Sequence, residues 1–569
     1  VSNSNFLNYS RPLAKNLSFL FENDEEFYYN KLTSAKEKNK RYFLIQRNIS
    51  VEELNKIKKM PLFKLGGVRG GLIIEKKNSR DYPLNKIAER TIGRERKISD
   101  NKFSGVGLEH AFGKELRGKN GIQLMQKISN GKWKPISSTN KIEPVSGSDI
   151  VTTINVGFQD ITHHSLLEQL ERYEADHGTA VVMETATGEI KAISNLGRTS
   201  EGKYYERLNY AVGEHFEPGS TFKLMSIIAA LEDDKVDMNT VVDTENGVVS
   251  FYGAKVRDSK KGGYGKISLN EVFKLSSNTG IVKIINEAYK EDPKKFSNRL
   301  YNMGLNNKLG LSILGESSPK IPHPNDKDWS GLSLPWMVYG YGVLLSPLQI
   351  LTFYNAVANN GEMVKPIFRK KNTLISNKII LNPSICSKST LDNVKLMLEN
   401  VVNEDGGTGS NIKSDIYKIA GKTGTGQVDY TTDNVQYISS FVGYFPADKP
   451  KYSCIVVIHK PNKSKGYYGS TVAAPVFKKI ADKIYSLIPE KVEFDNLRIE
   501  DFEKIKLTNS IKIDGSDFSI IKGKNFRNVL PLLENLGFEV IFKGNGSLVK
   551  NYRINKSLNK AEIELIWVY

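Results

Sequence analysis

A chain of 569 residues is longer than one ordinary domain, and the usual domain size of about 100–200 residues predicts roughly three domains. Its hydrophobic fraction of 39% and charged fraction of 25% are near globular averages, which excludes a disordered or fibrous chain. The formal net charge of +18 comes from lysines spread along the whole sequence rather than gathered on one segment, so we expect no nucleic-acid partner.

Cysteine and histidine are too sparse or too badly spaced to predict a disulfide framework or a metal site. The two cysteines are Cys386 and Cys454, and the second lies in the apolar run 452–458, where a small buried hydrophobe is expected. Among the seven histidines, His163 and His164 are adjacent on a polar helix and cannot face one ion together. The sequence therefore predicts neither a metal nor a cofactor.

The first 148 residues form a predicted N-terminal domain that is Lys-rich and irregular. It contains helical patches such as residues 51–59, many Gly and Asn breaks, and no catalytic motif. The pattern changes at residues 149–155, where β-branched residues predict a strand. Residues 159–174 then predict an amphipathic helix, so we place a domain boundary at 148/149.

Residues 149–488 are predicted to form one α+β domain. A hairpin is expected over residues 178–193, because two apolar runs surround a glycine-containing turn. The middle of the domain is mostly helical, most clearly at 222–231 and 347–359. Three later runs read as short strands, so distant segments would close one sheet; these are residues 419–426, 440–444 and 452–458.

One long uncharged stretch, residues 329–361, exceeds the length of a membrane span. Pro335, Pro347 and several glycines make it a poor span, and we expect a buried loop followed by a core helix.

The end of the chain is predicted to be a linker, 489–509, and a small α/β module, 510–569. The linker is charged and uneven in composition. In the module, residues 526–536 predict a short helix that ends at Gly537, and residues 562–569 alternate like a final strand.

The first chemical motif is Ser220-x-x-Lys223. Pro218 and Gly219 precede a helical segment, so Ser220 should open a helix with Lys223 one turn along the same face. A lysine of lowered pKa can take the proton from a serine hydroxyl, and free backbone N–H groups at a helix start favour an oxyanion. The same spacing occurs at 129–132 and 138–141, in stretches without a helix, and a helix cap with a solvated lysine is the alternative interpretation.

The second motif is Ser276-Ser277-Asn278. A hydroxyl and a carboxamide two residues apart can share one side of a loop, where the first relays a proton and the second positions Lys223 and the substrate amide. Ser-x-Asn also occurs at 138–140 and 268–270, and taken alone it is most often a turn.

The third motif, Lys422-Thr423-Gly424-Thr425, lies in a predicted strand. A glycine beside a site lets a substrate backbone approach closely, and a cation with hydroxyls there could bind a carboxylate. A phosphate-binding loop is the alternative, but it needs a glycine where Ile416 stands, and this segment leads into a strand rather than a helix.

The order of the three motifs resembles the penicillin-binding protein and serine β-lactamase superfamily. The context is similar to its class B, monofunctional transpeptidases: residues 217–220, 339–342, 346–349, 442–446 and 472–477 fit that class, and residues 105–121 resemble its N-terminal pedestal. The resemblance implies a transpeptidase domain with an antiparallel sheet packed by helices. The tail resembles, more loosely, a PASTA module.

The resemblance implies a D,D-transpeptidase that cross-links peptidoglycan stem peptides through an ester on Ser220 and is acylated by β-lactams. It implies Lys223 as the base, Ser276 as the proton relay and Asn278 as the residue that holds the donor peptide. The electrostatics and the carboxylate grip would come from the last motif: Lys422, Thr423, Gly424 and Thr425. The open alternatives are a β-lactamase or D,D-carboxypeptidase, and a non-catalytic wall-binding scaffold or β-lactam sensor.

The resemblance also implies a place and partners. We expect the periplasmic side of the inner membrane, an anchoring N-terminal helix that is absent from this chain, and a septal role with a membrane glycan polymerase and divisome proteins.

Overall fold

The structure is a computed structural model that describes residues 1–75, 87–99, 102–128, 133–136, 141–370, 378–428, 435–488, 517–544 and 548–566. The chain divides into two units, Val1–Lys86 and Ile87–Tyr569. The predicted linker 489–509 lies outside the described residues.

The first unit is helical, with α1 (Asn3–Leu20), α2 (Glu25–Glu37) and α3 (Val51–Lys58) as its main elements. The helix expected at residues 51–59 is confirmed as α3, whereas α1 and α2 were not predicted. Two short turns follow α3, η1 (Phe63–Leu65) and α4 (Gly66–Gly70). A small apolar core holds the unit together and contains Leu13, Leu17, Tyr28, Leu32, Ile57 and Phe63.

Short elements fill the chain between this unit and the central sheet. Three two-stranded ladders form here, β1–β2, β3–β6 and β4–β5. Their strands are β1 (Arg94–Ser99), β2 (Lys102–Val106), β3 (Ile122–Gln123), β4 (Met125–Lys127), β5 (Trp133–Pro135) and β6 (Lys141–Ile142). The helices are α5 (Glu89–Ile92), α6 (Gly107–Ala111) and α7 (Gly113–Arg117).

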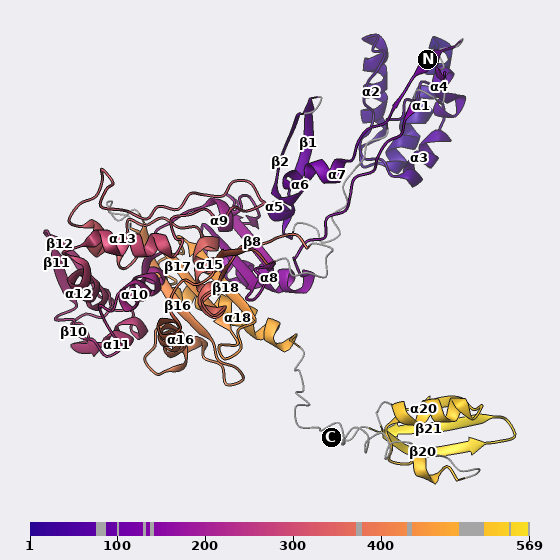
Figure 1. The fold of residues 1–569 in the computed structure, drawn as a ribbon. Coiled ribbons are helices and arrows are strands. Elements are labelled where there is room, and N and C mark those ends of the chain that lie inside the picture. Colours follow the sequence, from indigo (N-terminus) through magenta and orange to yellow (C-terminus); the bar gives the residue numbers. More distant parts are fainter. Residues whose placement is uncertain are drawn as a thin grey trace. The chain divides into compact units, whose positions relative to one another are not determined.

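A six-stranded antiparallel sheet lies in the second unit, in the order β16-β17-β18-β7-β8-β9. Four of its strands, β8, β16, β17 and β18, are labelled in Figure 1. Its strands are β7 (His177–Glu184), β8 (Ile190–Arg198), β9 (Tyr204–Tyr205), β16 (Ala420–Val428), β17 (Gln436–Phe445) and β18 (Tyr452–His459). The predicted hairpin and the three later strands are therefore confirmed. β18 pairs with β7, so two strands that are separated by more than half of the domain's sequence lie side by side in the sheet.

Helices cover both faces of the sheet. On one face, the ring of Phe158 in α8 (Val156–Tyr173) contacts Tyr452, and Phe477 of α18 (Ala474–Ser486) contacts Phe441. On the other face, Asn355 of α15 (Pro347–Ala358) accepts a hydrogen bond from Ser453, the neighbour of Tyr452 on β18. Successive residues of a strand point to opposite faces, so the sheet is the middle of three layers.

The region between β9 and β16 is mostly helical, as predicted. The predicted helices 222–231 and 347–359 are confirmed as α10 (Lys223–Glu232) and α15. Other elements of this region are α9 (Tyr210–Gly213), η3 (Gly219–Phe222), α11 (Leu269–Lys274), α12 (Asn278–Tyr289), α13 (Pro293–Asn302), α14 (Ser333–Met337), α16 (Lys388–Asn403) and η4 (Ser410–Ile412). The short helix α17 (Gly469–Val472) lies later in the chain, between β18 and α18. Short strands complete it: β10 (Val241–Asp243), β11 (Val248–Phe251), β12 (Ala254–Arg257), β13 (Lys266–Ser268), β14 (Met363–Val364) and β15 (Ile380–Asn382).

The strand predicted over residues 149–155 is wrong. The segment is extended, but Thr152 forms only an isolated bridge with Arg369, and the backbone N–H of Thr153 donates to the carbonyl of Phe368. β-branched residues favour extended backbone, yet a strand also needs a partner along its length. The segment instead leads directly into α8, the confirmed form of the helix predicted at 159–174.

The C-terminal part of the chain is a helix on a three-stranded sheet. The sheet order is β19-β21-β20, with β19 parallel and β20 antiparallel to the central strand. Its elements are η5 (Ser519–Ile521), α20 (Phe526–Asn535), β19 (Glu539–Lys543), β20 (Leu548–Asn555) and β21 (Lys560–Ile566). Phe518, Ile521, Leu533 and Ile563 belong to a separate apolar core, so the module is stabilised by its own contacts.

Two smaller predictions concern apolar segments. No helix within the described ranges is long and apolar enough to cross a bilayer. The stretch 329–361 instead forms a loop, α14 and the fully buried helix α15. Cys454 is fully buried on β18, as predicted, and neither it nor Cys386 is in a disulfide.

Candidate active site

The candidate nucleophile Ser220 lies in η3, the tight turn that leads into α10. Two neighbours hold this turn: Thr221 Oγ1 donates to the carbonyl of Pro218 at 2.8 Å, and the hydroxyl of Tyr354 donates to the carbonyl of Thr221 at 2.8 Å. The Ser220 side chain is half-buried, and no described residue forms a hydrogen bond with its hydroxyl. The hydroxyl is therefore free to meet a ligand.

Lys223 is the first residue of α10 and is completely buried. Its Nζ donates to the carbonyl of Ser276 and to Oδ1 of Asn278, both at 2.7 Å, and lies 3.3 Å from Ser276 Oγ. Burial lowers the pKa of Lys223 to about 7, because a desolvated ammonium is disfavoured. Near neutral pH a substantial fraction of this side chain is a neutral amine, which has a lone pair.

The second motif is a turn between α11 and α12. Ser276 has a left-handed backbone with φ of +56°, and Ser277 caps α12 by accepting from the N–H of Gly280. This conformation directs the carbonyl of Ser276 and the carboxamide oxygen of Asn278 to the same amine, that of Lys223. The Asn278 side chain also donates to the carbonyl of Arg257 at 2.8 Å, which fixes its orientation.

Asp258 organises this turn and was missed by the sequence analysis. Its carboxylate accepts from the backbone N–H of Asn278 at 2.6 Å and of Thr279 at 3.0 Å. It also accepts from the hydroxyls of Ser277 and Thr279. A carboxylate at a helix N-terminus satisfies backbone donors that lack a partner within the helix. No motif surrounds Asp258, so only its position in space reveals this role.

We predict that Asp258→Asn lowers stability and slows acylation. An amide replaces one accepting oxygen with a donor that faces other donors, which should cost about 1–3 kcal/mol of unfolding free energy. The resulting shift of Asn278 should slow acylation by a fluorescent penicillin roughly tenfold, since small displacements at a site are costly. Denaturation and acylation rates measure both effects, and Asp237→Asn, at an exposed turn, is the control. Unchanged stability and rate in Asp258→Asn would contradict the role assigned to it.

The third motif lies on β16, the edge strand of the sheet. Lys422 is completely buried, and its Nζ donates to Ser276 Oγ at 2.8 Å. Thr423 Oγ1 donates to the hydroxyl of Thr408 at 2.8 Å, and Thr425 Oγ1 accepts from the N–H of Gly469 at 2.9 Å.

Gly424 permits the close packing of this strand against the nucleophile turn. A Cβ at this position would lie 2.3 Å from Ser440 Oγ and 3.0 Å from a methyl carbon of Thr221. The strand can therefore pass beside η3 only because residue 424 has no side chain.

The hydroxyl of Ser276 joins the two buried amines. It is the acceptor for Lys422 and lies within hydrogen-bond distance of Lys223, although the three residues are far apart in the sequence. Burial and the nearby Lys223 amine place the pKa of Lys422 well below its usual range. Because the two buried amines are so close, a charge on one disfavours a charge on the other. A ligand carboxylate that binds beside Lys422 would favour the charged form of Lys422.

The comparisons with known proteins agree with this geometry. Residues 178–482 match the family described as "Penicillin binding protein transpeptidase domain", and residues 2–152 match "Penicillin-binding Protein dimerisation domain". The first match spans more than half of the chain. The chain belongs to the penicillin-binding proteins. With a dimerisation domain ahead of the transpeptidase domain, it is a class B penicillin-binding protein.

Relatives of this penicillin-binding protein include curated and solved proteins. It is 30% identical to "Peptidoglycan D,D-transpeptidase FtsI" of Buchnera aphidicola, covering 73% of this chain and 71% of the relative. It is 29% identical to "Stage V sporulation protein D" of Bacillus subtilis, covering 76% and 67% respectively. The transpeptidase domain of Burkholderia pseudomallei penicillin-binding protein 3 is 30% identical with a TM-score of 0.52, covering 59% of this chain and 96% of that one.

Gly340 of this penicillin-binding protein packs against the nucleophile turn at Gly219, and we predict that Gly340→Ala lowers both stability and the rate of acylation. Gly340 has φ of +90° and accepts from the N–H of Gly219 at 3.2 Å, and a Cβ would lie 2.2 Å from the Gly219 carbonyl oxygen. We expect a loss of about 1–3 kcal/mol in stability from the backbone strain alone, and a further loss of acylation as Ser220 moves.

Gly342→Ala is a matched control for this prediction. Gly342 also has positive φ, +70°, but nothing lies within 4 Å of a Cβ built there. Both variants therefore carry the backbone strain, and only Gly340→Ala adds the collision with Gly219. Equal acylation rates for the two alanine variants, measured with a fluorescent penicillin, would refute the steric argument.

Proposed function

We propose that this penicillin-binding protein is a peptidoglycan D,D-transpeptidase that works through an acyl-enzyme on Ser220. The observation that carries the proposal is the meeting of Lys223 and Lys422 at the hydroxyl of Ser276. A neutral base, a relay hydroxyl and a substrate-binding strand are the parts that acyl transfer by a serine requires. The names of the D,D-transpeptidase relatives give independent support.

In the first step Lys223 removes the proton of Ser220, and Oγ attacks the carbonyl carbon between the two terminal D-alanines of a donor peptide. A neutral lysine has two N–H bonds, and the two 2.7 Å contacts, to Ser276 and Asn278, use both of them. Its lone pair is then left for the serine proton. The oxyanion would lie against the backbone N–H groups of Ser220 and Thr425.

In the second step the peptide bond breaks, and the terminal D-alanine leaves as a free amine. Ser276 donates its hydroxyl proton to that amine. A proton from the neighbouring lysines then replaces the one that Ser276 lost, and Lys422 is placed to supply it because its Nζ donates to Ser276 Oγ. Asn278 holds the donor peptide. Lys422, Thr423, Gly424 and Thr425 bind the backbone and the terminal carboxylate. An amine of a second stem peptide then attacks the ester, and Ser220 regains its proton.

The wider setting is proposed from the resemblance of the sequence to class B transpeptidases. It is septal peptidoglycan synthesis on the periplasmic side of the inner membrane, with a membrane glycan polymerase and divisome proteins as partners, and the D,D-transpeptidase names of the relatives support the peptidoglycan part of it. The domains would be a pedestal over 1–148, a transpeptidase domain over 149–488, and a PASTA-like module over 510–569 after a linker. The separate apolar core of the C-terminal module supports its independence.

The test combines mass measurement with product analysis. Purified protein is treated with a fluorescent penicillin, and the intact mass and peptide map should place one stable adduct on Ser220. A donor pentapeptide with an acceptor amine should give a cross-linked product and free D-alanine. Rapid release of hydrolysed penicillin would instead identify a β-lactamase, release of D-alanine without cross-linking a carboxypeptidase, and absence of any adduct a scaffold.

A further inference from the structure

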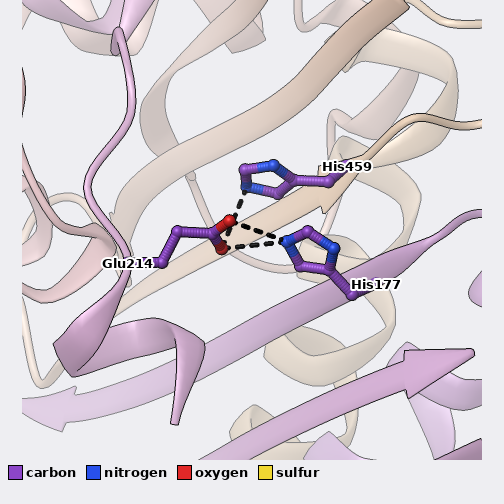
Figure 2. A group of neighbouring side chains, drawn as sticks. All are labelled: His177, Glu214 and His459. Carbon is purple, nitrogen blue, oxygen red and sulfur yellow. Dashed lines mark hydrogen bonds and ion pairs between the residues drawn. The ribbon is translucent and has the colours of Figure 1, made fainter. Parts of the chain in front are cut away.

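Three titratable side chains that the proposed chemistry does not use gather at one end of the sheet. His177 is the first residue of β7 and His459 the last residue of β18, and the two are paired directly opposite each other. Glu214 follows the short helix α9 and brings a carboxylate beside both imidazole rings, within reach of a nitrogen of each (Figure 2). The structure thus joins three segments that are distant in the sequence.

The three side chains present ligand atoms at distances suited to one metal ion. A Glu214 oxygen lies 2.9 Å from Nε2 of His177 and 3.6 Å from Nε2 of His459, and the three ligand atoms all lie within 4.8 Å of one another. Ligands in a tetrahedral zinc site, at bonds of about 2.0–2.1 Å, are about 3.3 Å apart. The two distances from the Glu214 oxygen, 2.9 Å and 3.6 Å, lie on either side of that value.

The ring nitrogen of His459 provides a second and independent indication of a ligand. The side chain is only 6% exposed, and Nε2 is buried without a hydrogen bond to any residue that the structure describes. Buried polar atoms normally have a partner, and an unpaired one calls for an explanation.

The surroundings of His177 resemble those of a metal-ligating histidine. While Nε2 faces Glu214, Nδ1 lies 2.7 Å from the carboxylate of Asp176. Histidines that bind metals usually donate the proton of the other ring nitrogen to a carboxylate, which fixes the ring and makes it more basic. The ring of His177 also stacks on the ring of Tyr210 and on that of His459, and the centroids are 4.2 Å apart in each pair.

We propose that His177, Glu214 and His459 form a binding site for a divalent transition metal, with zinc as the ion that this donor set favours. Two imidazoles and one carboxylate suit zinc, and a fourth position would be left for water. Glu214 is partly exposed, which gives an ion a path into the site.

The ion would fasten the segment that leads to Ser220 to the sheet. Only residues 215–219 separate Glu214 from Ser220, and Phe216 within them bridges to Leu345. A metal bound to all three ligands would therefore tie this segment to the ends of β7 and β18. The role assigned to the ion is structural and independent of the chemistry proposed for Ser220.

The test uses the full chain, stripped with a chelator and titrated with Co²⁺ and Zn²⁺ at mildly alkaline pH, because protons compete for His177. We expect one Co²⁺ per chain with the intense visible absorption of a tetrahedral site, displaced by Zn²⁺, and a higher melting temperature with Zn²⁺. Glu214→Gln and His459→Gln should abolish the absorption. Asp176→Asn, on an exposed side chain, should weaken binding about 10–100-fold.

His215→Gln is the matched control, because His215 is the exposed neighbour of Glu214 in the sequence. It should bind Co²⁺ as the unaltered chain does, as should Ser220→Ala. Circular dichroism confirms that each variant is folded, and if His459→Gln fails to fold, Glu214→Gln and Asp176→Asn decide the matter. Failure of the unaltered chain to bind, or binding that survives Glu214→Gln, would overturn the proposal.

Discussion

Replacing Ser220 with alanine should abolish covalent labelling by penicillins while leaving the fold intact. The hydroxyl makes no hydrogen bond to a described residue, so its removal costs little stability. Without the nucleophile no ester can form, and the loss of acylation and cross-linking should be at least about 10⁴-fold. Intact-mass measurement after incubation with a fluorescent penicillin, with thermal denaturation beside it, gives both readouts.

The sequence itself offers controls for this prediction. Ser129 and Ser138 also stand three residues before a lysine, and both lie outside the described residues. Ser129→Ala and Ser138→Ala should acylate at the rate of the unaltered protein. A Ser220→Ala protein that still forms the adduct, or an adduct mapped to a peptide without Ser220, would remove the foundation of the proposed mechanism.

The sequence could predict the motifs and their order because short local patterns carry that information. Pro218 and Gly219 before an apolar helix are sufficient to expect a tight turn at Ser220, and a lone Lys-Thr-Gly within a β-rich run is sufficient to expect a strand at Lys422. The apolar patterns also predicted α8, α10, α15 and five of the six strands of the central sheet, all but the two-residue β9.

The contacts between motifs could not be predicted, since they depend on the packing of distant segments. Nothing near Asp258 in the sequence indicates that its carboxylate holds the start of α12. The meeting of Lys422 with Ser276 requires the register of β16 against the helical region. The group of His177, Glu214 and His459 likewise follows from the pairing of β7 with β18.

The errors of the sequence analysis have the same physical origin. Helix α1 was not predicted because it contains Pro12 and many polar residues, and the burial of Leu13 and Leu17 against the rest of the unit stabilises it instead. The β-branched residues near Thr152 predicted a strand, but no neighbouring strand lies along that segment among the described residues. Tertiary contacts overrode local propensity in both cases.

Replacing Lys223 with methionine should slow acylation by about 10²–10⁴-fold, the usual contribution of a general base. Methionine fills similar space, but it has no lone pair to take the proton of Ser220. The unaltered protein should show a rate that rises with pH and levels off above about pH 7, because burial lowers the pKa of Lys223 to about 7. Below that pH the ammonium form dominates, and the rate should fall tenfold per pH unit.

Two further variants separate the base from a merely positive or structural lysine. Lys223→Arg keeps the charge but cannot lose its proton, so its rate should be low and should lack the rise near neutral pH. Lys274 lies close to Ser276 in the sequence and forms an ion pair with Glu404. The Lys274→Met variant should keep both the acylation rate and its pH profile. The measurement is the second-order rate of acylation by a fluorescent penicillin across a pH series. A Lys223→Met protein with an unaltered rate and pH profile would show that another group deprotonates Ser220, and the contacts of Lys223 with Ser276 and Asn278 would then be structural alone.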